Sequence, residues 1–339
     1  MTATEETTGP AGSGAGHPLA VEVAGLTKRY GDLVAVNGID FSVAQGEVFA
    51  FLGPNGAGKS TTIKMLCTLA RPTSGRAIVA GYDVATRAKA VRRHIGLVFQ
   101  EQTLDDQLTA EENLRFHAVL YGVPHDRIEP RIAEVLDLVS LSERRKDLVS
   151  TYSGGMARRL EIARGMLHTP RVLFLDEPTV GLDPQTRALM WADVLRLRDE
   201  EGVTIFLTTH YMDEAEYADR IAIIDYGSII ALDTPDALKA AIGADTVDLQ
   251  TTDDEAALGA LKREGFEVER NEAGLTIFVA DEEVAVGPVI ATVGVPVRTV
   301  RVHRPTLDDV FLHFTGREIR EQHGEAVSMF ARARGARRS

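Results

Sequence analysis

The sequence lacks several features that would place the protein in other classes. It has one cysteine, Cys67, which excludes an intrachain disulfide and a cysteine-built metal cluster and is typical of a reducing cytoplasm. No apolar run approaches the roughly 18–20 residues needed to span a bilayer. Residues 1–18 have neither a basic start nor an apolar core, so they predict no secretory signal and indicate a disordered lead-in.

The chain also has fewer basic than acidic residues. The chain has 37 Lys and Arg against 50 Asp and Glu, which gives a formal net charge of −13. Proteins that bind free duplex nucleic acid usually present a basic surface, so the charge balance argues against a nucleic-acid partner. The exception is the tail at 316–339, which carries Arg332, Arg334, Arg337 and Arg338. Such a tail is either a solvated end or a contact for anionic lipid.

What the sequence does contain is an alternation of strand-like and helix-like segments over residues 19–240. We expect strands up to Val48–Leu52, a helix over 59–69, a helix over 186–200, and strands over 172–175, 204–208 and 221–224. This alternation predicts an α/β protein with a mostly parallel sheet covered by helices. Residues from about 104 to 168 are helical in pattern instead, which indicates an inserted helical subdomain.

The pattern changes after residue 240. Residues 241–315 predict a small α+β domain of short strands and two helices over 253–264 and 282–293. Thr306 is typical of a helix N-cap, with Asp309 three residues later. We expect Leu307, Val310, Phe311 and Phe314 to share the inward face of that last helix.

A glycine-rich segment between a predicted strand and a predicted helix indicates a phosphate site. Glycines let successive backbone N–H groups turn toward one point, and the helix that follows presents its positive end there. The lysine adds a full charge for the β- and γ-phosphates, and the following serine hydroxyl can bind Mg²⁺. The residues assigned to the nucleotide are Gly53, Pro54, Asn55, Gly56, Ala57, Gly58, Lys59, Ser60 and Thr61.

A phosphate site alone does not hydrolyse a nucleotide, and a second strand end supplies the carboxylates. The apolar run 172–175 is followed by Asp176 and Glu177. We expect Asp176 to hold Mg²⁺ through water, and Glu177, which points in another direction, to act as general base toward an attacking water. Taken alone, such a pair is usually only a polar strand end; together with the phosphate site it predicts an ATPase.

At this point the sequence resembles the ATP-binding cassette (ABC) ATPases, over about residues 20–240. Gly53–Ser60 matches their Walker A motif and Val172–Asp176 their Walker B motif. Ser153, Gly154 and Gly155 match the centre of the family signature, which departs here in having Tyr152 for leucine and Met156 for glutamine. The phosphate-facing Ser-Gly-Gly is unchanged.

Four further family positions are present in the expected order. The resemblance implies that Tyr30 stacks on adenine, although a lone tyrosine at a strand end is often simple packing. It implies that Gln100 contacts Mg²⁺ and water and senses a membrane partner. Asp183 matches the D-loop, and His210 matches the switch histidine that contacts the γ-phosphate.

The segment from Arg304 to Phe311, with Thr315-Gly316-Arg317 after it, is similar to the C-terminal ending of the daunorubicin-resistance group of these ATPases. The resemblance implies a subunit that binds ATP and Mg²⁺, forms an ATP-sandwich homodimer, and drives a separate permease from the cytoplasmic face of the plasma membrane, for drug or antibiotic efflux. Two alternatives remain: a soluble ABC ATPase acting on nucleic acid or ribosomes, and a nucleotide-gated drug-sequestering protein. The sequence of this chain does not indicate which compound is transported.

Overall fold

The computed structural model describes residues 18–243, 245–271, 274–279 and 282–316. The predicted lead-in and the predicted basic tail therefore lie almost wholly outside the described residues. Within those residues, no helix is both long enough and apolar enough to cross a bilayer. The parallel sheet with helices on its faces confirms the expected α/β fold class.

A six-stranded sheet positions the phosphate segment. Its strand order is β10-β9-β3-β8-β7-β6. The strands β9, β3, β8, β7 and β6 run parallel, and β10 pairs antiparallel with β9 at one edge. β3 and β7 are buried along their whole length, as expected for strands covered on both faces. The bounds are β3 Val48–Leu52, β6 Ile95–Val98, β7 Val172–Asp176, β8 Thr204–Thr209, β9 Arg220–Asp225 and β10 Ser228–Asp233.

A second sheet, antiparallel and of order β2-β1-β4-β5, packs beside the first. Aromatic side chains fill the space between them: the ring of Phe41 lies 5.5 Å from Phe49 and 6.0 Å from Phe206, centre to centre. The bounds are β1 Leu19–Tyr30, β2 Leu33–Ala44, β4 Ser74–Val79 and β5 Tyr82–Asp83, with helices α1 Lys59–Leu66 and α2 Ala88–Arg93. The sequence pattern did not predict β4, β5 or α2.

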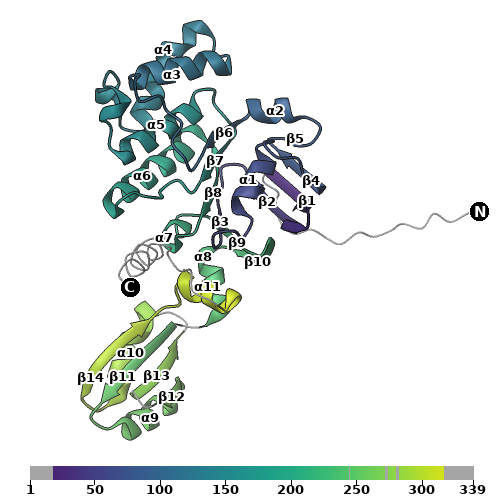
Figure 1. Cartoon of the computed structure of the whole chain (residues 1–339). Coiled ribbons are helices and arrows are strands. Elements are labelled where there is room, and N and C mark those ends of the chain that lie inside the picture. Colours follow the sequence, from purple (N-terminus) through teal and green to yellow (C-terminus); the bar gives the residue numbers. More distant parts are fainter. Residues whose placement is uncertain (1–17, 244, 272–273, 280–281, 317–339) are drawn as a thin grey trace, which may run out of the picture.

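The helical subdomain is inserted between β6 and β7, as the sequence predicts, and forms the upper part of Figure 1. Its first helix begins with a capping box in which Thr109 and Glu112 satisfy each other's backbone N–H groups. Apolar side chains of its helices join one core with the neighbouring face of the six-stranded sheet. The elements are α3 Ala110–Tyr121, α4 His125–Leu138, the 3₁₀ turns η1 Ser142–Arg144 and η2 Val149–Thr151, and α5 Gly154–Met166.

Two helices follow β7 and β8. α6 runs from Pro184 to Glu201, with Asp183 as its N-cap. The short α7, Met212–Ala215, follows the end of β8, and His210 lies between the two elements.

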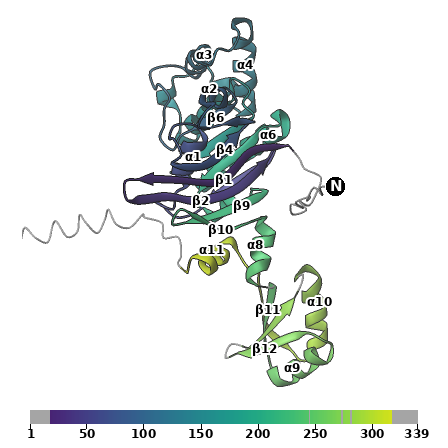
Figure 2. The same ribbon diagram turned by 90° about the vertical axis from the view of Figure 1, so that its right-hand side faces the viewer.

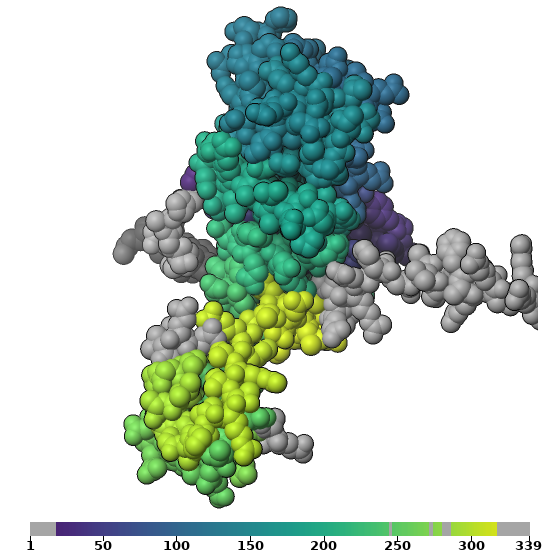
Figure 3. Space-filling view, turned by 90° about the vertical axis from the view of Figure 1, so that its left-hand side faces the viewer, coloured from purple at the N-terminus to yellow at the C-terminus, as the bar shows by residue number. Residues whose placement is uncertain are grey.

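The C-terminal part has a core of its own. Its elements run β11 Asp245–Thr251, α9 Asp254–Arg263, β12 Glu267–Asn271, β13 Gly274–Val279, α10 Glu282–Val293 and β14 Val297–His303. The four strands form an antiparallel sheet of order β12-β13-β11-β14, a βαββαβ arrangement of the ferredoxin-like type. Figure 3 shows this part as a separate lobe.

The last helix returns to the ATPase part. α8 (Pro235–Ile242) leads into the C-terminal lobe and α11 (Leu307–Thr315) leads out of it, and the two pack together. Leu307, Val310 and Phe311 are buried in the same core cluster as Leu238. The expected capping box of Thr306 and Asp309 is present. The inward placement of Phe314 was wrong: it is 37% exposed, because it lies in the last turn of α11, beyond the part of the apolar face that is covered.

Candidate active site

The phosphate segment has the geometry that the glycine pattern predicts. It follows β3, and Gly58 caps α1 with a φ of 112°, which a residue with a side chain rarely adopts. A Cβ atom on Gly58 would stand 2.6 Å from the carbonyl oxygen of Ala35, and one on Gly53 would stand 2.4 Å from that of Ile224. These positions therefore require glycine. The loop brings its backbone to the positive end of α1, which fits a phosphate group.

Lys59 and Glu177 form a buried ion pair at the start of that helix. Their side chains are 4% and 8% exposed, and Lys59 Nζ lies 3.2 Å from Glu177 Oε1. Lys59 Nζ also donates to the carbonyl oxygens of Gly53 at 2.7 Å and Pro54 at 3.2 Å. Burial is the largest influence on the lysine and lowers its pKa, while the charge of Glu177 opposes this. The ammonium group is thus held over the loop where a phosphate would contact it.

Gln100 and His210 also converge on Glu177. Gln100 Nε2 donates to Glu177 Oε2 at 3.3 Å, and His210 Nδ1 lies 3.4 Å from the same oxygen. Burial raises the pKa of Glu177, but His210 and the charge of Lys59 together hold it below its ordinary value. The carboxylate is therefore ionised near neutral pH and able to accept a proton.

The backbone fixes the direction of Glu177. Its φ is +48°, a left-handed value that is uncommon outside glycine. The N–H of Glu177 is held by both the carbonyl and the hydroxyl oxygen of Thr208, each at 3.1 Å. A strained backbone at a strand end is typical of functional residues, and here it holds the Glu177 side chain in one direction.

The surroundings of Asp176 fit a Mg²⁺ ion whose ligands come partly from the protein and partly from phosphates and water. Its Oδ1 accepts from Ser60 Oγ at 3.2 Å and from Thr208 Oγ1 at 2.6 Å. Among the described residues there is no group of three or more His, Cys, Asp or Glu side chains that could enclose a metal ion. One carboxylate beside one hydroxyl is the donor set that Mg²⁺ uses when phosphates and waters complete its shell. Ser60 and Asp176 would hold the ion, which would then neutralise charge on the phosphates.

The other predicted site residues stand apart. Within the described residues, no hydrogen bond or ion pair joins Tyr30 or the signature segment to the cluster around Glu177. Ser153 caps α5 by accepting from Met156 N at 3.3 Å. Asp183 caps α6 by accepting from Thr186 N at 3.0 Å. A Cβ on Gly155 would stand 2.0 Å from Thr186 Cγ2, so the signature packs directly on the first turn of α6.

Sequence reasoning missed Arg158, which lies on α5 and is 6% exposed. Its guanidinium donates to the carbonyl oxygens of Pro178 at 2.7 Å and Asp176 at 3.2 Å, and also to that of Phe99. It thereby ties the segment before Gln100 to the one that carries Glu177. Its position five residues after Ser153, inward-facing on the same helix, was the available signal.

Glu214 was missed as well. It lies on α7, is 0% exposed, and has Arg187 as its ion-pair partner. Burial raises the pKa of Glu214 to about 7, against the smaller lowering effects of Thr209, Arg187 and His210. The one available sequence signal for Glu214 was its spacing, four residues after His210.

This raised pKa predicts a pH-dependent stability. A carboxyl whose pKa is higher in the folded than in the unfolded state favours folding below the unfolded value, and that contribution is lost as the pH rises through about 7. Glu214→Gln has no such titration. We expect the free energy of unfolding of Glu214→Gln, relative to the parent chain, to increase by up to about 3 kcal/mol between pH 5 and pH 8. Urea denaturation at both pH values measures this, with exposed Glu216→Gln as the control; an unchanged difference would contradict it.

Comparisons with known proteins agree with this geometry. A family model described as ABC transporter matches residues 36–180, and one described as ATP-binding protein DrrA1-3-like, C-terminal domain, matches residues 234–315. The daunorubicin resistance ATP-binding protein DrrA3 of Streptomyces coeruleorubidus is 42% identical over 304 residues, which cover 88% of this chain and 96% of that protein. This chain belongs to the ABC transporter ATP-binding proteins. The linearmycin resistance ATP-binding protein LnrL of Bacillus subtilis is 40% identical to this ABC protein, over 89% of the chain and all of LnrL.

Solved structures of ABC proteins share the fold. The structure of CbiO1 from Clostridium perfringens, part of the transporter complex CbiONQ, is 30% identical with a TM-score of 0.62, and the match covers 66% of this chain and 91% of CbiO1. A dimeric post-hydrolysis structure of the ATP-binding cassette MJ0796, bound to ADP and Pi, is 26% identical with a TM-score of 0.57, over 63% of this chain and 98% of MJ0796. This ABC protein therefore has a P-loop ATPase domain and a DrrA-like C-terminal domain, as the resemblance implied.

Proposed function

We propose that this ABC protein is the ATP-hydrolysing subunit of an export system, in which two copies bind ATP between them and drive a separate membrane permease. The convergence of Lys59, Gln100 and His210 on Glu177 carries the proposal. Such a set places a base, a phosphate-binding cation and two polar groups at the carboxyl ends of neighbouring parallel strands, where ligands of α/β proteins bind.

The chemistry follows from those positions. Glu177 accepts a proton from the water that attacks the γ-phosphate, and Gln100 and His210 orient the water and the phosphate oxygens. Lys59 binds the β- and γ-phosphates and shields their charge. Arg158 keeps the segments that carry Gln100 and Glu177 at a fixed separation.

Two copies are needed because the signature segment lies apart from the phosphate site of its own chain. We propose that Ser153 and Gly155 of one copy complete the site of the other, so that ATP bridges two N-terminal helix ends. MJ0796, whose cassette is dimeric with ADP and Pi, supports this arrangement. Hydrolysis removes the bridge, and the two copies separate as rigid bodies.

Mixing two inactive variants tests the shared site. Lys59→Ala disables the phosphate site and Ser153→Arg disables the signature, so each variant alone is expected to hydrolyse ATP at least about 10²-fold more slowly than the parent chain. In a mixed dimer, one site combines the intact phosphate segment of one chain with the intact signature of the other. We therefore expect mixing to restore roughly a quarter of the parent activity. No recovery over a range of mixing ratios would contradict the shared site.

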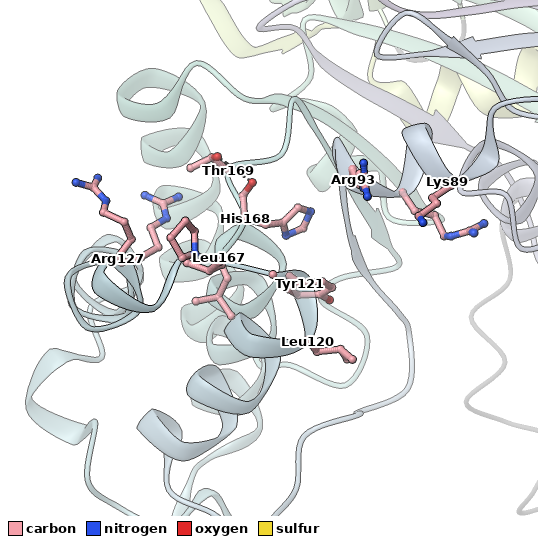
Figure 4. Close-up of a pocket in the computed structure, with 13 residues that line it drawn as sticks. Lys89, Arg93, Leu120, Tyr121, Arg127, Leu167, His168 and Thr169 are labelled. Carbon is pink, nitrogen blue, oxygen red and sulfur yellow. Dashed lines mark hydrogen bonds between the residues drawn. The ribbon is translucent and has the colours of Figure 1, made fainter.

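A groove in the helical subdomain fits contact with the permease. It has a volume of about 950 Å³ and lies between α2, the α3–α4 corner and the segment after α5. Figure 4 shows Lys89 and Arg93 on one side, Arg127 on the other, and Tyr121 and His168 between them. Its described lining contains no aspartate or glutamate: Lys89, Arg92, Arg93, Leu120, Tyr121, Gly122, Val123, Pro124, Arg127, Arg131, Leu167, His168 and Thr169.

The groove is connected to the ATP site. His168 Nε2 lies 2.9 Å from the carbonyl oxygen of Ile95, at the start of β6, the strand that leads to Gln100. The Tyr121 ring packs on His168, with ring centres 4.5 Å apart. Leu120 is 67% exposed, so the groove offers apolar surface beside cations. These features favour a permease segment that bears both carboxylates and apolar side chains.

Charge reversal in the groove tests this contact. Arg93→Glu combined with Arg127→Glu is expected to weaken capture of a co-expressed candidate permease by at least about 10-fold. ATP hydrolysis by the isolated chain should stay within about 2-fold of the parent. Lys262→Glu with Arg263→Glu, at two exposed positions of α9, is the control. Undiminished capture at physiological salt would exclude this groove as the docking surface.

The cargo is proposed from the relatives. Their names include daunorubicin and doxorubicin resistance (DrrA of Streptomyces peucetius), linearmycin resistance and Nod factor export, which supports efflux of a drug or antibiotic over action on nucleic acid or ribosomes. The complete set around Glu177 argues against a drug-sequestering protein that does not hydrolyse ATP. We propose a peripheral position at the cytoplasmic face of the plasma membrane, and co-purification with a membrane protein tests it.

A further inference from the structure

A loosely held buried ion pair lies beside the switch histidine. Glu214 is fully buried on α7, and its Oε1 lies 4.0 Å from Nε of Arg187 in the first turn of α6. That separation exceeds a hydrogen bond. Among the described residues, both carboxylate oxygens and Arg187 Nε lack a partner at full hydrogen-bond geometry, and the Thr209 hydroxyl gives the carboxylate only a weak contact. A buried carboxylate held in this way does little to stabilise the fold, which points to a role in the site.

A continuous set of contacts leads from this pair to the base. The Arg187 guanidinium lies over the Tyr211 ring, 4.4 Å from its centre. The ring centres of Tyr211 and His210 are 4.1 Å apart, and His210 Nδ1 is 3.4 Å from Glu177 Oε2. The arginine stands on the helix that begins at Asp183, so these contacts join α6 to the catalytic carboxylate.

We propose that Glu214 and Arg187 are positioning residues that fix the Tyr211 ring and thereby hold His210 in its working orientation. In this proposal both residues act through the ring and not directly on the nucleotide. Glu214 keeps the guanidinium of Arg187 over the ring, and the ring in turn limits the rotation of the neighbouring imidazole. The inference rests on the proposed function, since the orientation of His210 matters to the reaction only if the site hydrolyses ATP.

The arrangement makes the pair sensitive to protonation. Burial places the pKa of Glu214 at about 7. The groups that face it are Arg187 from α6, the Thr209 hydroxyl at the end of β8, His210 just after β8, and Glu177 after β7. Below that pH the carboxyl is neutral and its attraction for Arg187 is lost; above it the ion pair is complete.

Glu214→Gln, measured in the full chain by single-turnover hydrolysis of radiolabelled ATP, tests the proposal. We expect hydrolysis about 10-fold slower than in the parent at pH 8.5, with ATP affinity unchanged within about 2-fold. The ratio of parent to variant rates should fall toward about 1 at pH 5.5, where the parent carboxyl is itself neutral. Taking this ratio cancels titrations common to both proteins. Glu201→Gln, which removes one of the two carboxylates paired with buried Arg131, is the control and should leave the rate unchanged.

A double-mutant cycle separates positioning from mere structure. If Glu214 acts through His210, then Glu214→Gln should cause no further loss in a His210→Ala chain. Arg187→Lys, which keeps the charge but not the planar stack, should slow hydrolysis as much as Glu214→Gln, and it carries the test if the glutamine variant does not fold. Equal losses in both His210 backgrounds, or a rate ratio independent of pH, would overturn the proposal while the parent activity stands. A parent chain that hydrolyses no ATP would instead contradict the proposed function, and the inference with it.

Discussion

Glu177→Gln is expected to lower the rate of ATP hydrolysis by about 10²- to 10⁴-fold, the range typical of a lost general base. ATP binding should persist, because Lys59 keeps its contacts with the carbonyl oxygens of Gly53 and Pro54, and the neutral amide removes a negative charge from beside the phosphates. We therefore expect the variant to remain as an ATP-bound dimer. Size-exclusion chromatography with bound-nucleotide analysis measures this, alongside steady-state hydrolysis.

The control for this variant is Glu47→Gln. Glu47 is buried to the same degree as Glu177, but it precedes β3 at the end of the strand away from the phosphate loop. The Glu47→Gln substitution should leave the rate of ATP hydrolysis within about 2-fold of the parent rate. Hydrolysis by Glu177→Gln at a near-parent rate would show that another group takes the proton.

Lys59→Ala is expected to act on binding itself. The variant removes a buried ammonium group from the entrance of α1 and leaves Glu177 without its closest cation. Because a charged contact to phosphate in a protected site is strong, we expect ATP affinity to fall by at least about 10²-fold, which corresponds to about 2.7 kcal/mol. Isothermal titration calorimetry with MgATP measures the change.

Lys64→Ala is the matched control for that change. Lys64 lies on the same helix and is exposed, so its loss should leave ATP affinity within about 2-fold of the parent. If Lys59→Ala bound ATP as tightly as the parent, the phosphate would not contact this lysine, and the assignment of the loop would have to be revised.

Local sequence was a good guide to the elements around the phosphate loop. The glycine positions are fixed by backbone conformation and close approach, both of which are encoded by neighbouring residues. The end of β7 was equally clear because an apolar run stops at two carboxylates. The starts of helices α3 and α5 are also locally encoded, because the side chains of their N-cap residues, Thr109 and Ser153, accept hydrogen bonds from the first turn.

Contacts between distant segments were not predictable in this way. Arg158 binds carbonyl oxygens on two loops, and carbonyl oxygens carry no residue identity. Thr208 joins Asp176 only because β7 and β8 are neighbours in the sheet. Glu214 gains its partner from α6, which precedes it by a whole strand. The placement of Phe314 failed because a helical pattern gives the direction of the apolar face but not how far along the helix that face is covered.

The return of α11 to the ATPase core has a practical consequence. The C-terminal lobe is attached at both its entry and its exit, and the buried side chains of α11 share a cluster with Leu238. A chain cut just after α8 would therefore expose apolar surface that α11 normally buries. A soluble minimal ATPase would need polar substitutions on that surface. For the same reason, the lobe is not free to rotate about a single linker. Any tilt of the lobe must deform the chain at both α8 and α11.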